Sequence, residues 1–170
     1  IEGHNEFGRP YSEYYPLEAI EFTGDSTVSR TDVGMTMMGL TVDNFSNTNP
    51  EFIVRFHVTD GYLTINPIEN VVVTIEGATD TTDYDGQEHI VTGYTATATS
   101  SLYDVTDNNT DFIFSGNAIA RRTDAGTTYM GLAPEQFTNR NYNFTNVTFE
   151  VTDGNQTIEP INVTVTIKGA

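Results

Sequence analysis

The chain has 170 residues, and its 24 Asp and Glu against 7 Lys and Arg give a formal net charge of −17. That balance argues against nucleic acid or an anionic membrane as partner, because both carry negative charge. The lack of cysteine excludes a disulfide framework and thiol catalysis. No apolar stretch approaches the roughly 18 residues of a membrane-spanning helix, so no direct membrane insertion is expected. The charge suits a soluble, mutually repelling protein that is extracellular or adapted to high salt.

The first predicted segment is rich in tyrosine and precedes the rest of the first module. It contains Tyr11, Tyr14 and Tyr15. Exposed tyrosines would stack on sugars or anchor a protein interface, which would make this a carbohydrate- or host-protein-binding module. Buried tyrosines would instead belong to a core. Both interpretations stay open from the sequence.

From residue 22 onward the chain repeats itself. Residues 22–78 and 114–170 align with roughly half of their positions identical, which indicates duplication of a structural unit. The paired anchors include Arg30/Arg122, Asp32/Asp124, Gly34/Gly126, Leu40/Leu132 and Phe45/Phe137. A duplicated unit of this size predicts modules that space, display or grip, and not a single catalytic pocket.

Within each repeat, Thr-Asp-Val/Ala-Gly at 31–34 and 123–126 predicts a tight turn. The neighbouring Arg30 and Arg122 are two residues from Asp32 and Asp124, a spacing that favours a local ion pair. Residues 133–137 predict one helical turn with an early proline. The expected core residues are Phe45, Phe56, Phe137 and Phe149, with Leu40 and Leu132 beside them.

Alternating apolar residues then flank an Asp-Gly pair in both repeats. Residues 54–58 precede Asp60-Gly61, and residues 147–151 precede Asp153-Gly154. Asp-Gly between alternating runs is a strong hairpin signal. We therefore expect 54–58 to pair antiparallel with 63–65, and 147–151 with the run to Ile158.

An acidic cluster opens the second repeat. Asp80, Asp83 and Asp85 are candidate Ca²⁺ ligands, with a solvated turn as the alternative, because the spacing departs from that of a calcium loop. His4, His57 and His89 show no zinc-ligand spacing. No nucleophile or phosphate-binding motif occurs. We expect no enzyme activity, and no cofactor beyond that candidate Ca²⁺.

Six Asn-x-Ser/Thr sequons would carry sugar only in a host that glycosylates them. They lie at Asn44, Asn108, Asn143, Asn146, Asn155 and Asn162.

The end of the chain carries a second copy of an internal apolar run. Val163, Val165 and Ile167 repeat Val71, Val73 and Ile75, each followed by Glu/Lys-Gly, and Ile1-Glu2-Gly3 repeats the same motif without the run. We therefore expect residues 162–170 to form a strand of a following module, supplied covalently or by donation between subunits. The predicted organisation is a first β repeat at 1–68, whose N-terminal strand is missing or supplied by a neighbour, and a second at 69–161.

Several of these motifs resemble the Gly-rich, mostly-β tandem repeats (MBG-like) of large bacterial cell-surface and adhesin proteins. The motifs are Tyr-Asp-Gly-Gln-Glu at 84–88, Gly93-Tyr94, Tyr-Met-Gly-Leu at 129–132, Asn-Tyr-Asn-Phe at 141–144 and the Val-Thr-Asp-Gly pairs. The resemblance covers nearly all of the second repeat and the last two-thirds of the first, which lacks the Tyr-Asp-Gly-Gln-Glu motif. It implies stalk or adhesin modules at the cell surface.

Together these features predict an all-β protein of two tandem small β domains, sandwich-like or β-grasp-like, arranged end to end. The predicted function is a non-catalytic structural or adhesive repeat of a bacterial surface protein or extracellular fibre that assembles linearly. Its expected partners are neighbouring repeats or subunits of the same protein, head to tail. The alternative is a host-glycan or host-protein binding module that uses Tyr11, Tyr14 and Tyr15.

Overall fold

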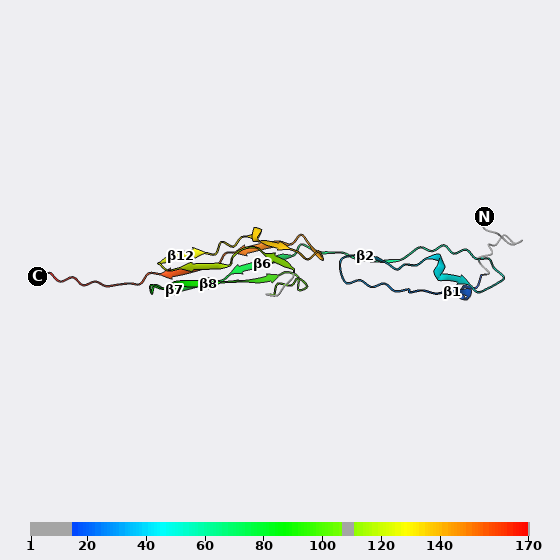
Figure 1. Ribbon diagram of the computed structural model, residues 1–170, viewed down its shortest axis with the longest axis horizontal. Coiled ribbons are helices and arrows are strands. Elements are labelled where there is room, and N and C mark those ends of the chain that lie inside the picture. Colours follow the sequence, from blue (N-terminus) through cyan, green and yellow to red (C-terminus); the bar gives the residue numbers. More distant parts are fainter. Residues whose placement is uncertain (1–14, 107–110, 170) are drawn as a thin grey trace. The chain divides into compact units, whose positions relative to one another are not determined.

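The computed structural model describes residues 15–106 and 111–169, and the chain divides into two units, Ile1–Asn66 and Pro67–Ala170. The described elements are short strands and single turns of 3-10 helix, which confirms the predicted all-β class (Figure 1). No helix among the described residues is long and apolar enough to cross a membrane. The division after Asn66 leaves Ile68 in the second unit, where it pairs with Phe144.

Unit 1 contains two antiparallel strand pairs. In the first pair Phe22 lies opposite Phe45, and in the second Gly34 lies opposite Ile65. The first pair is β1 with β3, the second is β2 with β4, and the described elements are η2 (Leu17–Ala19), β1 (Ile20–Phe22), β2 (Gly34–Met37), η3 (Val42–Asn44), β3 (Phe45–Asn47) and β4 (Tyr62–Ile65).

Unit 2 contains the same succession and further strands before it. The counterparts of β1, β2, η3, β3 and β4 are, in that order, β10 (Phe112–Phe114), β12 (Gly126–Tyr129), η4 (Pro134–Gln136), β13 (Phe137–Asn139) and β16 (Asn155–Glu159). The remaining elements are β5 (Ile68–Glu69), β6 (Val72–Gly77), β7 (Thr79–Asp83), β8 (His89–Thr92), β9 (Tyr94–Ala98), β11 (Ile119–Arg122), β14 (Phe144–Thr145) and β15 (Thr148–Thr152). The single helical turn predicted at 133–137 is present as the 3-10 turn η4.

A parallel ribbon runs through unit 2. Its first strand is β5, β6 and β7 in succession, and its second is β14, β15 and β16. The pairing keeps one register from Phe144 opposite Ile68 to Glu159 opposite Asp83. On its other edges, β6 pairs antiparallel with β9 and β16 pairs antiparallel with β12. Strands β8 and β11 form a separate antiparallel pair. The ribbon therefore joins the first and last parts of the unit.

The ribbon changes sheets where two glycines meet. A Cβ on Gly77 would collide with the backbone of Gly154, and one on Gly154 would collide with the carbonyl oxygen of Ala78. Only glycine allows two backbones to approach this closely. Upstream of this crossing the ribbon lies in the sheet β15-β6-β9, and downstream in the sheet β12-β16-β7.

The predicted Asp-Gly hairpins are wrong in both units. β15 pairs with β6 and not with β16, and β4 pairs with β2, while residues 54–58 pair with no strand of the described chain. The aspartates are occupied elsewhere: Asp153 accepts hydrogen bonds from the N–H groups of Gly131 and Leu132. Asp60 holds Gly39 and Leu40 in the same way. In unit 2, Asp153-Gly154 lies where the chain passes from the sheet that contains β15 to the sheet that contains β16.

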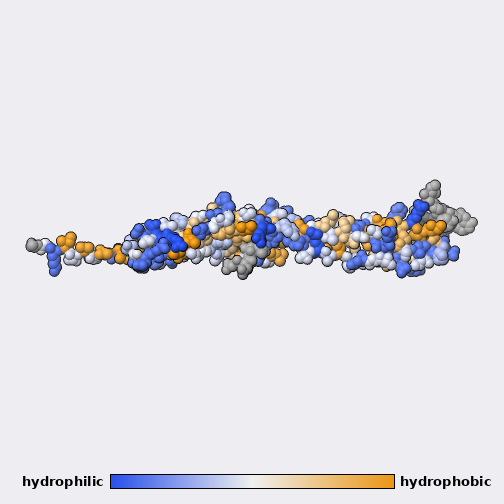
Figure 2. Space-filling view, in the orientation of Figure 1, coloured by the Kyte–Doolittle hydropathy of each residue, from blue (hydrophilic) through white to orange (hydrophobic). Residues whose placement is uncertain are grey.

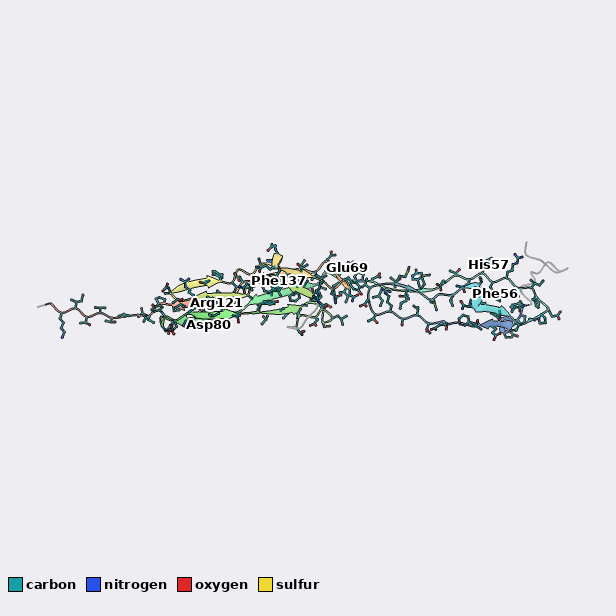
Figure 3. All side chains as sticks on the ribbon, in the orientation of Figure 1. Phe56, His57, Glu69, Asp80, Arg121 and Phe137 are labelled. Carbon is teal, nitrogen blue, oxygen red and sulfur yellow. The ribbon has the colours of Figure 1, made fainter. Side chains whose placement is uncertain are left out.

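The core of unit 2 is an aromatic cluster closed by β6. Val71, Val73 and Ile75 are at most 1% exposed and pack with the rings of β10, β13 and β14. Phe137 lies at the centre, stacked on Phe114 at 4.7 Å between ring centroids. Figure 3 labels Phe137 among the strands of unit 2.

The expected core residues are buried to different extents in the two units. Phe137 and Leu132 are buried, and Phe149 is half-buried against the cluster. Their counterparts in unit 1, Phe45, Leu40 and Phe56, are all only half-buried. The prediction of burial is confirmed for unit 2 at Phe137 and Leu132, and it overstated burial in unit 1.

We predict that Phe137→Ala lowers the free energy of unfolding of unit 2 by about 3–5 kcal/mol, because it removes a ring at the centre of a closed core. Phe45→Ala is the matched control, and it should cost less than half as much, because Phe45 lies in a more open core. Chemical denaturation followed by tyrosine fluorescence measures both. Equal losses at the two positions would contradict the difference in packing.

Candidate functional site

The position that β6 holds in unit 2 is the feature from which the candidate site is built. β6 lies between β15, which runs parallel to it, and β9, which runs antiparallel. Its inward residues Val73 and Ile75, with Val71 just before it, are three of the seven buried members of the core cluster. The unit's other core side chains close around this strand, so we name its place in the fold the central-strand position.

In unit 1 the corresponding position faces a half-open core. Residues 52–59 match β14 and β15 in sequence and show the same alternation, with Phe52, Val54, Phe56 and Val58 half-buried. Phe56 contacts Phe45 at 5.9 Å between ring centroids, whereas His57 is exposed (Figure 3). No strand of residues 15–66 pairs with residues 52–59. Phe22, at the other side of this core, is 38% exposed.

The predicted assembly strand at the end of the chain is fully exposed. Val163, Val165 and Ile167 are 74%, 75% and 89% exposed, although their counterparts in β6 are at most 1% exposed. Figure 1 shows residues 161–169 continuing beyond β16 without a neighbouring strand, and Figure 2 shows apolar residues along this segment. Burial of each such side chain is worth about 1.5–3 kcal/mol. Burying this segment against another part of the protein would therefore be strongly favourable.

A tyrosine closes the core at one end of each unit. In unit 2 the Tyr103 hydroxyl donates to the carbonyl oxygen of Asp111 and to Asn139 Oδ1, and its ring meets Phe144 edge-on at 5.0 Å. In unit 1 the Tyr15 hydroxyl donates to Asn47 Oδ1 at 2.6 Å, and its ring meets Phe52 at 5.3 Å.

The structure therefore places Tyr15 inside unit 1 as the counterpart of Tyr103. It is half-buried, with ring and hydroxyl both engaged in packing. Tyr11 and Tyr14, the other two residues of the predicted binding segment, lie outside the described residues.

The recurrent arginines hold the turns that follow them. Arg122 donates to the carbonyl oxygen of Ala125 and to Thr128 Oγ1, and Arg30 donates to the carbonyl oxygen of Val33 and to Thr36 Oγ1. The guanidinium lies over Gly126 or Gly34, where a Cβ would collide with it. The positive φ of these glycines, 128° and 131°, also requires the residue type. This arrangement is structural in both units.

The acidic cluster is spread along a strand and a turn. Asp80 and Asp83 are exposed on β7, three residues apart, so they project to opposite faces. Asp85 accepts a hydrogen bond from the N–H of Gln87 and contacts His89 at 3.1 Å. These two contacts, the Gln87 N–H first, hold the pKa of Asp85 below its usual range. Among the described residues no three His, Cys, Asp or Glu side chains gather as a metal site.

The sequons are accessible to different degrees. Asn146 and Asn162 are exposed, whereas Asn44, Asn143 and Asn155 are half-buried. Asn44 Oδ1 accepts the N–H of Thr41 at the start of η3. Asn108 lies outside the described residues.

Sequence reasoning missed one pair of residues that organises both cores. Asn139 Oδ1 accepts the Tyr103 hydroxyl and the N–H of Asn141, and its amide donates to the carbonyl oxygens of Asn141 and Phe144. Asn47 makes the same contacts in unit 1. The available signal was the presence of Asn at the same position of both repeats.

Comparison of the chain with protein-family models, with curated proteins and with solved structures found no match.

The Tyr103 contact predicts a loss of stability in alkali. Burial, together with the negative charge of Asp111, raises the pKa of Tyr103 from 10.0 to about 12. Because the folded pKa lies above the unfolded one, the contribution is complete below pH 10 and is lost as the pH rises through 12, to a total of about 3 kcal/mol.

Melting curves between pH 8 and pH 12 measure this loss. Tyr103→Phe is the matched variant, and it should cost about 1 kcal/mol at neutral pH, because two acceptors lose their donor. It should also flatten the decline above pH 10. An equally steep decline in Tyr103→Phe would show that another group causes it.

Proposed function

We propose that the protein is a non-catalytic structural repeat of a bacterial cell-surface protein or extracellular fibre, in which successive modules assemble linearly. The observation that carries the proposal is the second copy of the central strand. Residues 163–169 repeat the sequence of 71–77, and the first copy is the buried centre of unit 2. A chain that carries a further, exposed copy of its own core strand is suited to be continued by another module.

The shared architecture of the two units supports the same function. Three arrangements occur in both units: a tyrosine hydroxyl bound to an asparagine side chain, an arginine bound to the carbonyl oxygen of the turn that follows it, and an aspartate that accepts two loop N–H groups. Each of them binds backbone groups of its own unit. Residues that recur in this way serve the fold of every module, as repeat proteins require.

The charge of the chain supports an exposed location. A net charge of −17 on 170 residues keeps a protein soluble and discourages side-by-side association of copies. Strand pairing, and not covalent cross-links, would carry load in such a fibre, since the chain has neither cysteine nor more than one lysine.

Immunogold labelling of intact, unpermeabilised cells of the source organism tests this proposal. Antibodies raised against residues 67–161 should label the cell surface or extracellular fibres, and mild protease treatment of intact cells should remove the label. A cytoplasmic protein labelled in parallel controls for lysis. Labelling that appears only after permeabilisation would overturn the proposal.

A further inference from the structure

We infer that residues 161–169 of one chain occupy the central-strand position of unit 1 in a second copy, pairing in parallel with residues 52–59. The inference rests on the proposed function and names the partner through which it would operate. The internal precedent is unit 2, where β5 and β6 pair in this way with β14 and β15. Transferred through the repeat, the pairs are Phe52 with Ile161, Arg55 with Thr164, Phe56 with Val165, His57 with Thr166, Val58 with Ile167 and Thr59 with Lys168.

A pair of asparagines in unit 2 explains why this match is specific. Asn70 and Asn146 have φ of 59° and 53°, in the left-handed region that asparagine tolerates better than most residues. The constant register of the ribbon places them opposite each other. Each strand thus carries one extra residue at the same level. Because the extra residues Asn70 and Asn146 lie at the same level in the two paired strands, the register is the same before and after them.

Both members of this pair are absent from the proposed interface. Unit 1 has the single residue Ile53 where unit 2 has Thr145-Asn146, and the end of the chain has the single residue Asn162 where unit 2 has Glu69-Asn70. Residues 52–59 and 161–169 therefore both alternate without interruption. Ile53 is fully exposed and lies on the outward face.

Residues 161–169 and residues 52–59 both lack the extra residue of unit 2, and this selects unit 1 as the partner. A one-residue slip between paired strands turns every side chain to the opposite face. Residues 161–169 placed against a strand of the unit 2 type would lose register at the extra asparagine. Against residues 52–59 they direct Val163, Val165 and Ile167 inward over the half-open core that contains Phe22, Phe45 and Phe56.

Disulfide trapping in the 170-residue chain tests the register, because the chain contains no cysteine of its own. His57→Cys combined with Thr166→Cys should give a ladder of cross-linked oligomers on non-reducing gels. Glu150→Cys with Thr74→Cys is the positive control within one chain, since these residues are paired in unit 2. His57→Cys with Ile167→Cys is the negative control, since residue 167 faces the other side.

Insertions test whether the missing residue sets the specificity. Replacing Asn162 by Glu-Asn, or Ile53 by Thr-Asn, should each lower the cross-linked yield of the His57→Cys/Thr166→Cys protein about tenfold or more, the effect of about 1.4 kcal/mol. Making both replacements together should restore the yield. Circular dichroism melting of unit 2 in every variant verifies folding.

Four outcomes would overturn the inference: no cross-link from the first cysteine pair, equal ladders from both inter-chain pairs, a ladder insensitive to the insertions, or a cross-link confined to the monomer. In the last case the partner would be the chain's own unit 1. None of these outcomes affects surface labelling on cells, so the proposed function would fail or stand separately.

Discussion

The structure of unit 2 depends on one strand whose pairing partner lies far away in sequence. β6 is the centre of the core of unit 2, and it pairs in parallel with β15 across all the strands between them. A parallel pair needs a long connection, and here β7 to β14 provide it. The first and last segments of the module must therefore meet before the aromatic cluster closes. Long-range contacts of this kind cost loop entropy and slow the folding of β proteins.

The same sequence motifs occur in unit 2, where β6 lies against the core, and in residues 15–66 of unit 1, where no described strand takes that place. Phe137 in unit 2 is 5% exposed, whereas Phe45 in unit 1 is half-buried, although both sit at the start of a strand after a 3-10 turn. The local devices are intact in both units: Asp60 clamps its loop as Asp153 does, and Tyr15 reaches Asn47 as Tyr103 reaches Asn139. The same local hydrogen bonds thus shape the segments of both units, whereas the core is more closed in unit 2, where Val71, Val73 and Ile75 pack into it.

The sequence predicted the all-β class and some of the strands, such as those at 63–65 and 147–151, because alternation is a local signal that needs no partner. The predicted strands at 54–58 and 162–169 alternate in the same way, but they form no strand in the structure. The sequence could not predict which strands pair. Asp153-Gly154 has the composition of a hairpin turn, but Gly154 is required by the close approach of Gly77, and Asp153 by the N–H groups of residues 131 and 132. Both causes lie far away in sequence. The duplication did reveal that residues 161–169 repeat the sequence of a core strand, whereas the role of the extra asparagine could be inferred only from the register of the ribbon.

The distribution of charge reconciles an acidic chain with self-association. Residues 52–59 contain one arginine, one histidine and no acid, and residues 161–169 contain the single lysine and no acid. The two segments of the proposed interface could therefore be buried without removing a carboxylate from water, which is the costly step in covering an acidic surface. The 24 acidic residues all lie elsewhere, where they would repel other copies that approach side by side. Residues 52–59 would accept a strand from another copy, whereas the acidic surface elsewhere would repel it. This combination favours addition of copies along one direction over disordered aggregation.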